Sequence, residues 1–220
     1  MTADSVIFDL DGTLWDATSV TAETWIKVLE RHPGVRCAEK LDRAAVKKYM
    51  GLTNEELAKI FFPELDLGDA YGLMMESCEL ENLWLPQRGG ILYPKTAETL
   101  TELRRRGLRL FIVSNCQDGY IEAFLTAHKM YHLFEDWESS GRSGKNKAEN
   151  ISDITRRNLL SSPVYVGDTI SDSVGARGAG VPFIYAKYGF GEENGRGRTD
   201  DYDDAIETIS CLPGLLERKY

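Results

Sequence analysis

The sequence predicts an α/β fold in which a Rossmann-like, doubly wound parallel sheet carries an inserted α-helical cap. Short apolar runs rich in Val, Ile and Phe recur along the 220 residues, as expected for parallel strands covered on both faces. Helical patterns separate these runs, and the alternation of strand and helix favours βαβ units. A long helical stretch without a clear strand follows the first apolar run, and this stretch predicts the insertion.

Four segments are expected to be strands of this sheet, and each ends in small or acidic residues: SVIFDLDG, LRLFIVSN, SPVYVGDT and VPFIYAKYG. Helices are expected between them. KTAETLTELRRRG places Ala97, Leu100 and Leu103 at helical spacing and stops at Gly107, a residue typical of helix C-termini. KAENISDITRRNLL repeats the pattern with Ala148, Ile151, Ile154 and Leu159. The predicted core therefore consists of residues 1–16 and 91–220.

Residues 17–90 are expected to form the helical cap. AETWIKVLERH, LDRAAVKKYMG, TNEELAKIFF and AYGLMMESCELENLW all have helical periodicity. Thr53 is expected to cap the third of these helices, with Glu56 completing a capping box. PQRGGILYP, residues 86–94, is rich in Pro and Gly and is predicted to be the linker that returns to the core.

Composition narrows the classes of function. Asp and Glu total 35 against 26 Lys and Arg, and the formal charge of −9 argues against nucleic-acid binding. No stretch approaches the roughly 18 apolar residues of a membrane span, and the N-terminus lacks a signal-peptide pattern. The cysteines are widely spaced without a CxxC pair, which indicates neither a zinc site nor a disulfide framework; they are Cys37, Cys78, Cys116 and Cys211. We therefore expect a cytoplasmic protein.

Polar residues follow the predicted strands where ligands bind in an open α/β sheet, at the carboxyl ends of the strands. Carboxylates, a hydroxyl and an ammonium at this edge suit Mg²⁺ and a phosphoryl group, because Mg²⁺ prefers carboxylate, water and phosphate oxygens. In chain order, the residues concerned are Asp9, Asp11, Ser114, Asn115, a lysine that is either Lys145 or Lys147, Asp168 and Asp172. Gly12 is expected to allow the turn that brings the first two carboxylates together.

The motifs DLDGT, SN, the lysine of GKNKAEN, and GDTISD occur in an order that resembles the haloacid dehalogenase-superfamily hydrolases. The resemblance is to the branch with a helical cap after the first strand, which includes phosphoglycolate phosphatase and β-phosphoglucomutase. It implies a Mg²⁺-dependent phosphomonoester hydrolase that acts on a small phosphorylated metabolite through an aspartyl-phosphate. It favours Lys147 over Lys145 as the motif lysine.

The resemblance also implies a role for each residue. Asp9 would be the nucleophile and Asp11 the general acid–base. Asp9, Asp168 and the backbone carbonyl of Asp11 would bind the metal. Phosphate would be bound by Ser114, Asn115 and Lys147. Lys147 would also neutralise the charge of the phosphoryl group, and Asp172 would orient the lysine or a metal-bound water.

Three alternatives stay open at this point. A β-phosphoglucomutase-like mutase usually has basic cap residues, whereas MGLTNEEL places Met50 and Asn54 at the equivalent positions. A phospho-receiver domain also gathers Asp, Ser or Thr and Lys at strand ends, but it is shorter and has no helical insertion. A catalytically inactive binding protein would not need intact motifs. The sequence makes no prediction of the oligomeric state.

Overall fold

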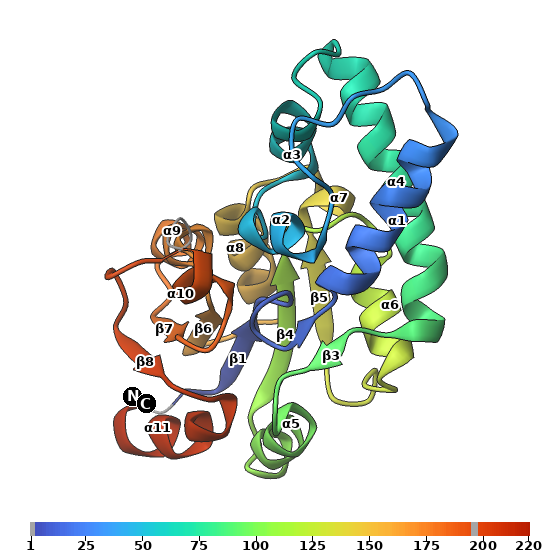
Figure 1. Cartoon of the computed structure of the whole chain (residues 1–220). Helices are drawn as coiled ribbons and strands as arrows, with labels where there is room; N and C mark the ends of the chain where they lie inside the picture. The colour runs from blue at the N-terminus through green and yellow to red at the C-terminus, as the bar shows by residue number, and fades with distance from the viewer. Residues whose placement is uncertain (1–2, 195–197) are drawn as a thin grey trace.

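A six-stranded parallel sheet forms the centre of the computed structural model, which describes residues 3–194 and 198–220. The strand order is β5-β4-β1-β6-β7-β8, so the first strand lies in the middle of the sheet (Figure 1). The α/β fold class is confirmed. The strands are β1 (Ser5–Phe8), β4 (Arg109–Ser114), β5 (Asp136–Ser139), β6 (Pro163–Gly167), β7 (Phe183–Ala186) and β8 (Asp204–Ile206).

The four strands expected from the sequence correspond to β1, β4, β6 and β7, whereas β5 and β8 were not predicted. Both missed strands lie at the edges of the sheet. The sequence of β5 is DWES and that of β8 is DAI, and each is only partly buried. An edge strand lacks the continuous apolar run of a strand covered on both faces, so apolar runs identify the central strands alone.

Helices cover both faces of the sheet. Along β1, Val6 and Phe8 belong to one apolar cluster and Ile7 to another, because successive side chains point to opposite faces. The first cluster includes residues of α5, α6 and α11, and the second includes residues of α8 and α9. The core helices are α5 (Thr96–Arg105), α6 (Tyr120–Ala127), α7 (Ser140–Ser143), α8 (Lys147–Arg157), α9 (Ile170–Ala179), α10 (Phe190–Asn194) and α11 (Leu212–Lys219), preceded by the 3₁₀ turn η1 (Ile209–Cys211).

Four helices of the described chain follow β1 and precede α5, and they stand over one end of the sheet (Figure 1): α1 (Thr18–Arg31), α2 (Arg43–Lys48), α3 (Asn54–Phe61) and α4 (Leu67–Arg88). They have an apolar cluster of their own, in which Phe61 packs edge-on against Trp25 and Tyr49 at centroid distances of 5.0 and 5.3 Å. The predicted capping box of Thr53 and Glu56 is confirmed. No helix in the described part of the chain is both long and apolar enough to cross a membrane.

Two short strands, β2 (Trp15–Asp16) and β3 (Ile91–Leu92), pair antiparallel where the chain leaves the core and returns to it. Asp16 is the register partner of Ile91. We therefore propose the division into a core of residues 1–16 and 91–220 and a cap of residues 17–90.

The predicted start of the return linker was wrong, because residues 86–88 continue α4. Pro86 lies in the last turn of the helix, where its missing N–H removes only one hydrogen bond from a helix of 22 residues. The helix ends at Gly89, which has φ 67° and donates its N–H to the Leu85 carbonyl at 2.8 Å. Pro86 therefore marks the end of a helix rather than the start of a linker.

Candidate active site

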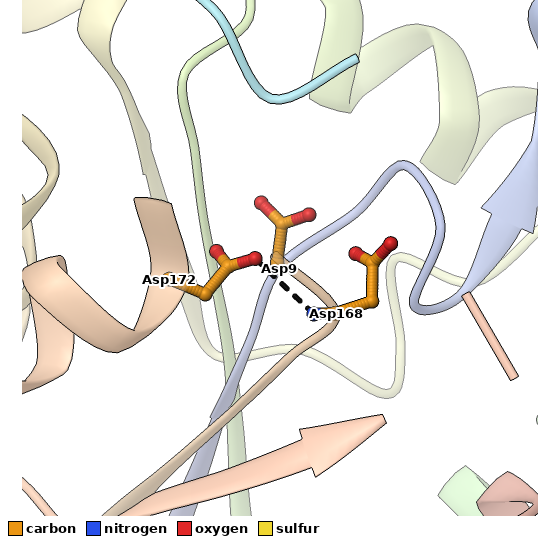
Figure 2. A group of neighbouring side chains, drawn as sticks. All are labelled: Asp9, Asp168 and Asp172. Atoms are coloured by element: carbon orange, nitrogen blue, oxygen red, sulfur yellow. Dashed lines mark hydrogen bonds between the residues drawn. The ribbon is translucent and has the colours of Figure 1, made fainter. Parts of the chain in front are cut away.

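Three aspartates meet at the carboxyl end of the central strands. Asp9 directly follows β1, Asp168 directly follows β6, and Asp172 lies in the first turn of α9. One carboxylate oxygen from each lies within 4.8 Å of those of the other two, and Figure 2 shows the side chains side by side. All three residues are buried. Three carboxylates at this separation repel one another and have lost hydration, so their ionised forms require compensating positive charge.

Lys147 supplies part of that charge. It is the first residue of α8, it is 5% exposed, and its Nζ lies 2.9 Å from Asp9 Oδ1 and 2.5 Å from Asp172 Oδ1. Burial disfavours the ammonium, but Asp172 and Asp9 outweigh this and raise the pKa of Lys147 above its ordinary value. Lys145, by contrast, is exposed and pairs with Asp153 at 2.5 Å. The structure thus brings Lys147, and not Lys145, to the aspartates.

Asp172 uses both of its oxygens within the protein. Its Oδ1 accepts hydrogen bonds from Lys147 and, at 3.1 Å, from the Tyr165 hydroxyl. Its Oδ2 accepts from the Asp168 N–H at 3.1 Å, as the dashed line in Figure 2 marks, and from the Thr169 N–H and hydroxyl at 2.9 and 2.7 Å. The side chain therefore holds the lysine and the loop after β6 in place, in agreement with an orienting role.

Asp168 is enclosed by backbone. Its Oδ1 accepts from the Thr13 hydroxyl at 3.1 Å and its Oδ2 from the Phe190 N–H at 2.7 Å. Gly12, at φ +86°, leaves space for this carboxylate, because a Cβ there would lie 2.2 Å from Asp168 Oδ2. Burial, with the charges of Asp172 and Asp9, raises the pKa of Asp168 well above its ordinary value.

A divalent cation fits this arrangement. The three carboxylates face one ammonium, so the ionised cluster has two uncompensated negative charges. Burial and the neighbouring Asp172 raise the pKa of Asp9 to about 7, although Lys147 opposes the rise. Carboxylate oxygens that are destabilised in this way, close together and buried, are suitable ligands for a hard cation such as Mg²⁺. Asp172 accepts more hydrogen bonds than Asp9 or Asp168, so the latter two carboxylates have more capacity for the cation.

Asp11 lies apart from the three-aspartate cluster. Its Oδ1 accepts a hydrogen bond of 3.0 Å from the Tyr120 hydroxyl of α6. Enclosure in the protein, followed by the charge of Asp9, raises the pKa of Asp11 well above its ordinary value, while the Tyr120 bond opposes that rise. The raised pKa favours the protonated form of the Asp11 carboxyl, and a protonated carboxyl can donate a proton.

Ser114 ends β4 at the same edge of the sheet, and Asn115 directly follows it. Ser114 is buried and lines the cavity above the aspartates together with Asp9 and Lys147. The Asn115 amide donates to the Gly51 carbonyl of the cap and to the Ser171 hydroxyl, both at 3.1 Å. The side chain of Asn115 thus connects the cap to the core, a contact that the sequence did not predict.

That cavity lies between the cap and the core and has a volume of about 60 Å³. Sequence reasoning did not assign Glu81 of α4 to it. Glu81 is 4% exposed and accepts hydrogen bonds from Trp25 Nε1 at 2.7 Å and from Gln117 Nε2 at 2.8 Å. Burial raises the pKa of Glu81 to about 7, although these bonds oppose the rise. The sequence contains one indication of this role. Glu81 follows the buried Cys78 by three residues and the buried Ser77 by four, so it lies on the same helix face, where an acidic residue is unusual.

Comparison with known proteins identifies the family. The model of the haloacid dehalogenase-like hydrolases matches residues 6–186, so the chain belongs to this family and the resemblance of its motifs is confirmed. Within the family it is a phosphatase, and several of its curated relatives are phosphoglycolate phosphatases, which are phosphoric monoester hydrolases. The receiver and inactive-binding alternatives are thereby set aside.

Three proteins of known name or structure are similar to this chain over nearly its whole length. The phosphoglycolate phosphatase of Nitrosospira multiformis is 26% identical over 231 residues, which cover 97% of this chain and 92% of the relative. A solved Bacteroides fragilis protein assigned to the haloacid dehalogenase-like hydrolases has a TM-score of 0.81 at 26% identity, covering 96% of this chain and 99% of that one. CbbY from Rhodobacter sphaeroides, solved with phosphate, has a TM-score of 0.77 at 17% identity, with 96% of each chain covered, and shares the fold.

Replacing Lys147 tests the buried ion pairs. Lys147→Met should reduce phosphatase kcat/KM on the order of 100-fold or more, because it leaves the Asp9 and Asp172 carboxylates without their ammonium. Lys145→Met is the matched control and should stay within about twofold of the original enzyme, since surface ion pairs contribute little. Equal losses in the two variants, measured as phosphate release, would contradict this assignment.

Glu81 should make stability depend on pH. Its folded pKa of about 7 lies above its ordinary value near 4.5, so Glu81 destabilises the fold increasingly as pH rises from 4.5 through 7. Glu81→Gln removes this titration and should gain about 2 kcal/mol relative to the original protein between pH 5 and pH 8. Urea unfolding at both pH values measures the difference, with the exposed Glu79→Gln on the same helix as control. A pH-independent difference would show that Glu81 titrates normally.

Proposed function

We propose that the protein is a Mg²⁺-dependent phosphomonoester hydrolase that acts on a small phosphorylated metabolite through an aspartyl-phosphate on Asp9. The observation that supports this most is the position of Lys147 Nζ between Asp9 and Asp172, whose carboxylates lie close to that of Asp168. This arrangement combines a carboxylate that can attack phosphorus with positive charge that reduces its repulsion by the phosphate dianion.

Asp9 and Asp168 would hold the Mg²⁺ ion through their side chains, and Asp11 would add its backbone carbonyl. When bound, Mg²⁺ neutralises charge on the phosphoryl oxygens. Asp172 would act indirectly, since its hydrogen bonds to Lys147, Thr169 and the Asp168 N–H fix the groups around it. Lys147 and Ser114, which both line the cavity, would bind phosphoryl oxygens.

In the first step the Asp9 carboxylate forms a bond to phosphorus while the bond from phosphorus to the ester oxygen breaks. Asp11, whose raised pKa favours the protonated form, would give its proton to the departing oxygen. In the second step a water attacks phosphorus, Asp11 takes a proton from that water, and the bond between phosphorus and Asp9 breaks. Phosphate leaves and both carboxyl groups return to their initial states.

The helices of residues 17–90 would cover the site during this reaction. A cavity of about 60 Å³ has room for roughly four to six water-sized groups, which suits a small metabolite. A cavity of this size favours a small substrate over a nucleic acid or a protein. Cover of this kind also limits the access of bulk water during the first step.

Asp9→Asn tests the nucleophile. The amide has the same shape but cannot form the acyl-phosphate, so phosphate release should fall on the order of 1,000-fold or more. The original enzyme, quenched with acid during turnover, should have bound phosphate that hydroxylamine releases, and the variant should have none. Asp69→Asn, at an exposed cap position, is the control for side-chain amidation. Substantial turnover by Asp9→Asn would eliminate the proposed intermediate.

Asp168→Asn tests the metal ligand. Loss of one anionic oxygen should raise the Mg²⁺ concentration needed for half-maximal phosphate release by at least about tenfold. Activity at saturating Mg²⁺ should recover in part, because Asp9 and the Asp11 carbonyl are unchanged. A Mg²⁺ titration that coincides with that of the original enzyme would exclude Asp168 as a ligand.

A further inference from the structure

Most of the acidic and basic side chains that line the cavity between cap and core are acidic. Among the described residues that line it, the acids are Asp9, Asp11 and Glu81, and the one basic side chain is Lys147. Lys147 already contacts Asp9 and Asp172. The part of the cavity that would face the leaving group of a bound ester therefore presents Asp11 and Glu81 without a cation among the lining residues.

The basic residues of the nearby helix α2 contact groups outside the cavity. Arg43 pairs with Asp16 at 2.6 Å, Lys48 pairs with Glu39 at 3.0 Å, and Lys47 lies 5.2 Å from the centroid of the Phe190 ring. None of the three is among the residues that line the cavity. A second anionic group on a substrate would thus meet carboxyl groups and find no positive partner.

Glu81 is held with its carboxyl group at the cavity by two donors. Trp25 donates to Oε1 from α1, and Gln117 donates to Oε2 from the loop between β4 and α6. Both bonds favour the ionised form of the carboxyl. The cap wall beside it is apolar, since Met50, Leu52 and Leu57 also line the cavity. Negative charge in a low-dielectric wall strongly disfavours a like charge nearby.

We propose that the enzyme selects phosphate esters with an uncharged or cationic leaving group, and that Glu81 is the residue that disfavours anionic ones. The proposal rests on the proposed function, because it assigns the leaving group of the same hydrolytic site. It separates this chain from the phosphoglycolate phosphatases among its relatives, since phosphoglycolate has a carboxylate next to the ester carbon.

Two nearly isosteric esters test the proposal. Phosphoglycolate and phosphoglycolamide differ only in a carboxylate and an amide, so the ratio of their kcat/KM values cancels the steps they share. With Mg²⁺ at pH 8, the original enzyme should favour the amide by at least about tenfold, and O-phosphoethanolamine should also exceed phosphoglycolate. Glu81→Gln should reduce the amide-to-acid ratio at least about threefold. Glu79→Gln, exposed on the same helix, should keep the original ratio.

Each outcome has a distinct meaning. Phosphoglycolate turnover equal to or faster than that of the amide would overturn the inference while leaving the phosphatase proposal in place. A preference for the amide that persists unchanged in Glu81→Gln would overturn the role of Glu81. Absence of Mg²⁺-dependent phosphate release from all three esters would overturn the proposed function itself, and the inference with it. A change in the ratio cannot come from partial unfolding, because unfolding lowers both kcat/KM values equally.

Discussion

The contact of Lys147 with Asp9 and Asp172 is the interaction on which the site depends. Three elements meet there, because Asp9 directly follows β1, Lys147 begins α8 and Asp172 lies in the first turn of α9. A buried ammonium is costly unless it is paired, and so is each buried carboxylate. Since each group compensates another, the ion pairs connect the three elements, and they fix the position of the Asp9 carboxylate at this edge of the sheet.

The three aspartates at the carboxyl end of the sheet differ in their hydrogen bonds, and we infer that they differ in role. Asp172 receives donors on both oxygens and so stabilises the loop after β6. Asp9 and Asp168 remain destabilised, as their raised pKa values indicate. Stability and reactivity are therefore assigned to separate carboxylates, which lets the protein fold around a charge imbalance that a cation can later satisfy.

Much of this could be predicted from the sequence, because the residues that meet at the site follow apolar strands in a recognisable order. The central strands were identified by their apolar runs, whereas β5 and β8 were missed because edge strands are only partly buried. Pro86 belongs to a run rich in Pro and Gly that predicts a linker, but the last turn of a helix tolerates proline. Glu81 was not assigned, because its place in the cavity depends on contacts with Trp25 and Gln117, which lie 56 and 36 residues away.

The pairing of β2 with β3 has a consequence for how this architecture can diversify. Because the outgoing and returning segments are register partners, the inserted region begins and ends at almost the same point in space. A replacement of any length whose two ends meet there would leave the strand order of the main sheet unchanged. The β2–β3 pair is thus a fixed attachment point for the inserted region. Selectivity can evolve by exchange of that region while the groups at the edge of the main sheet keep their geometry.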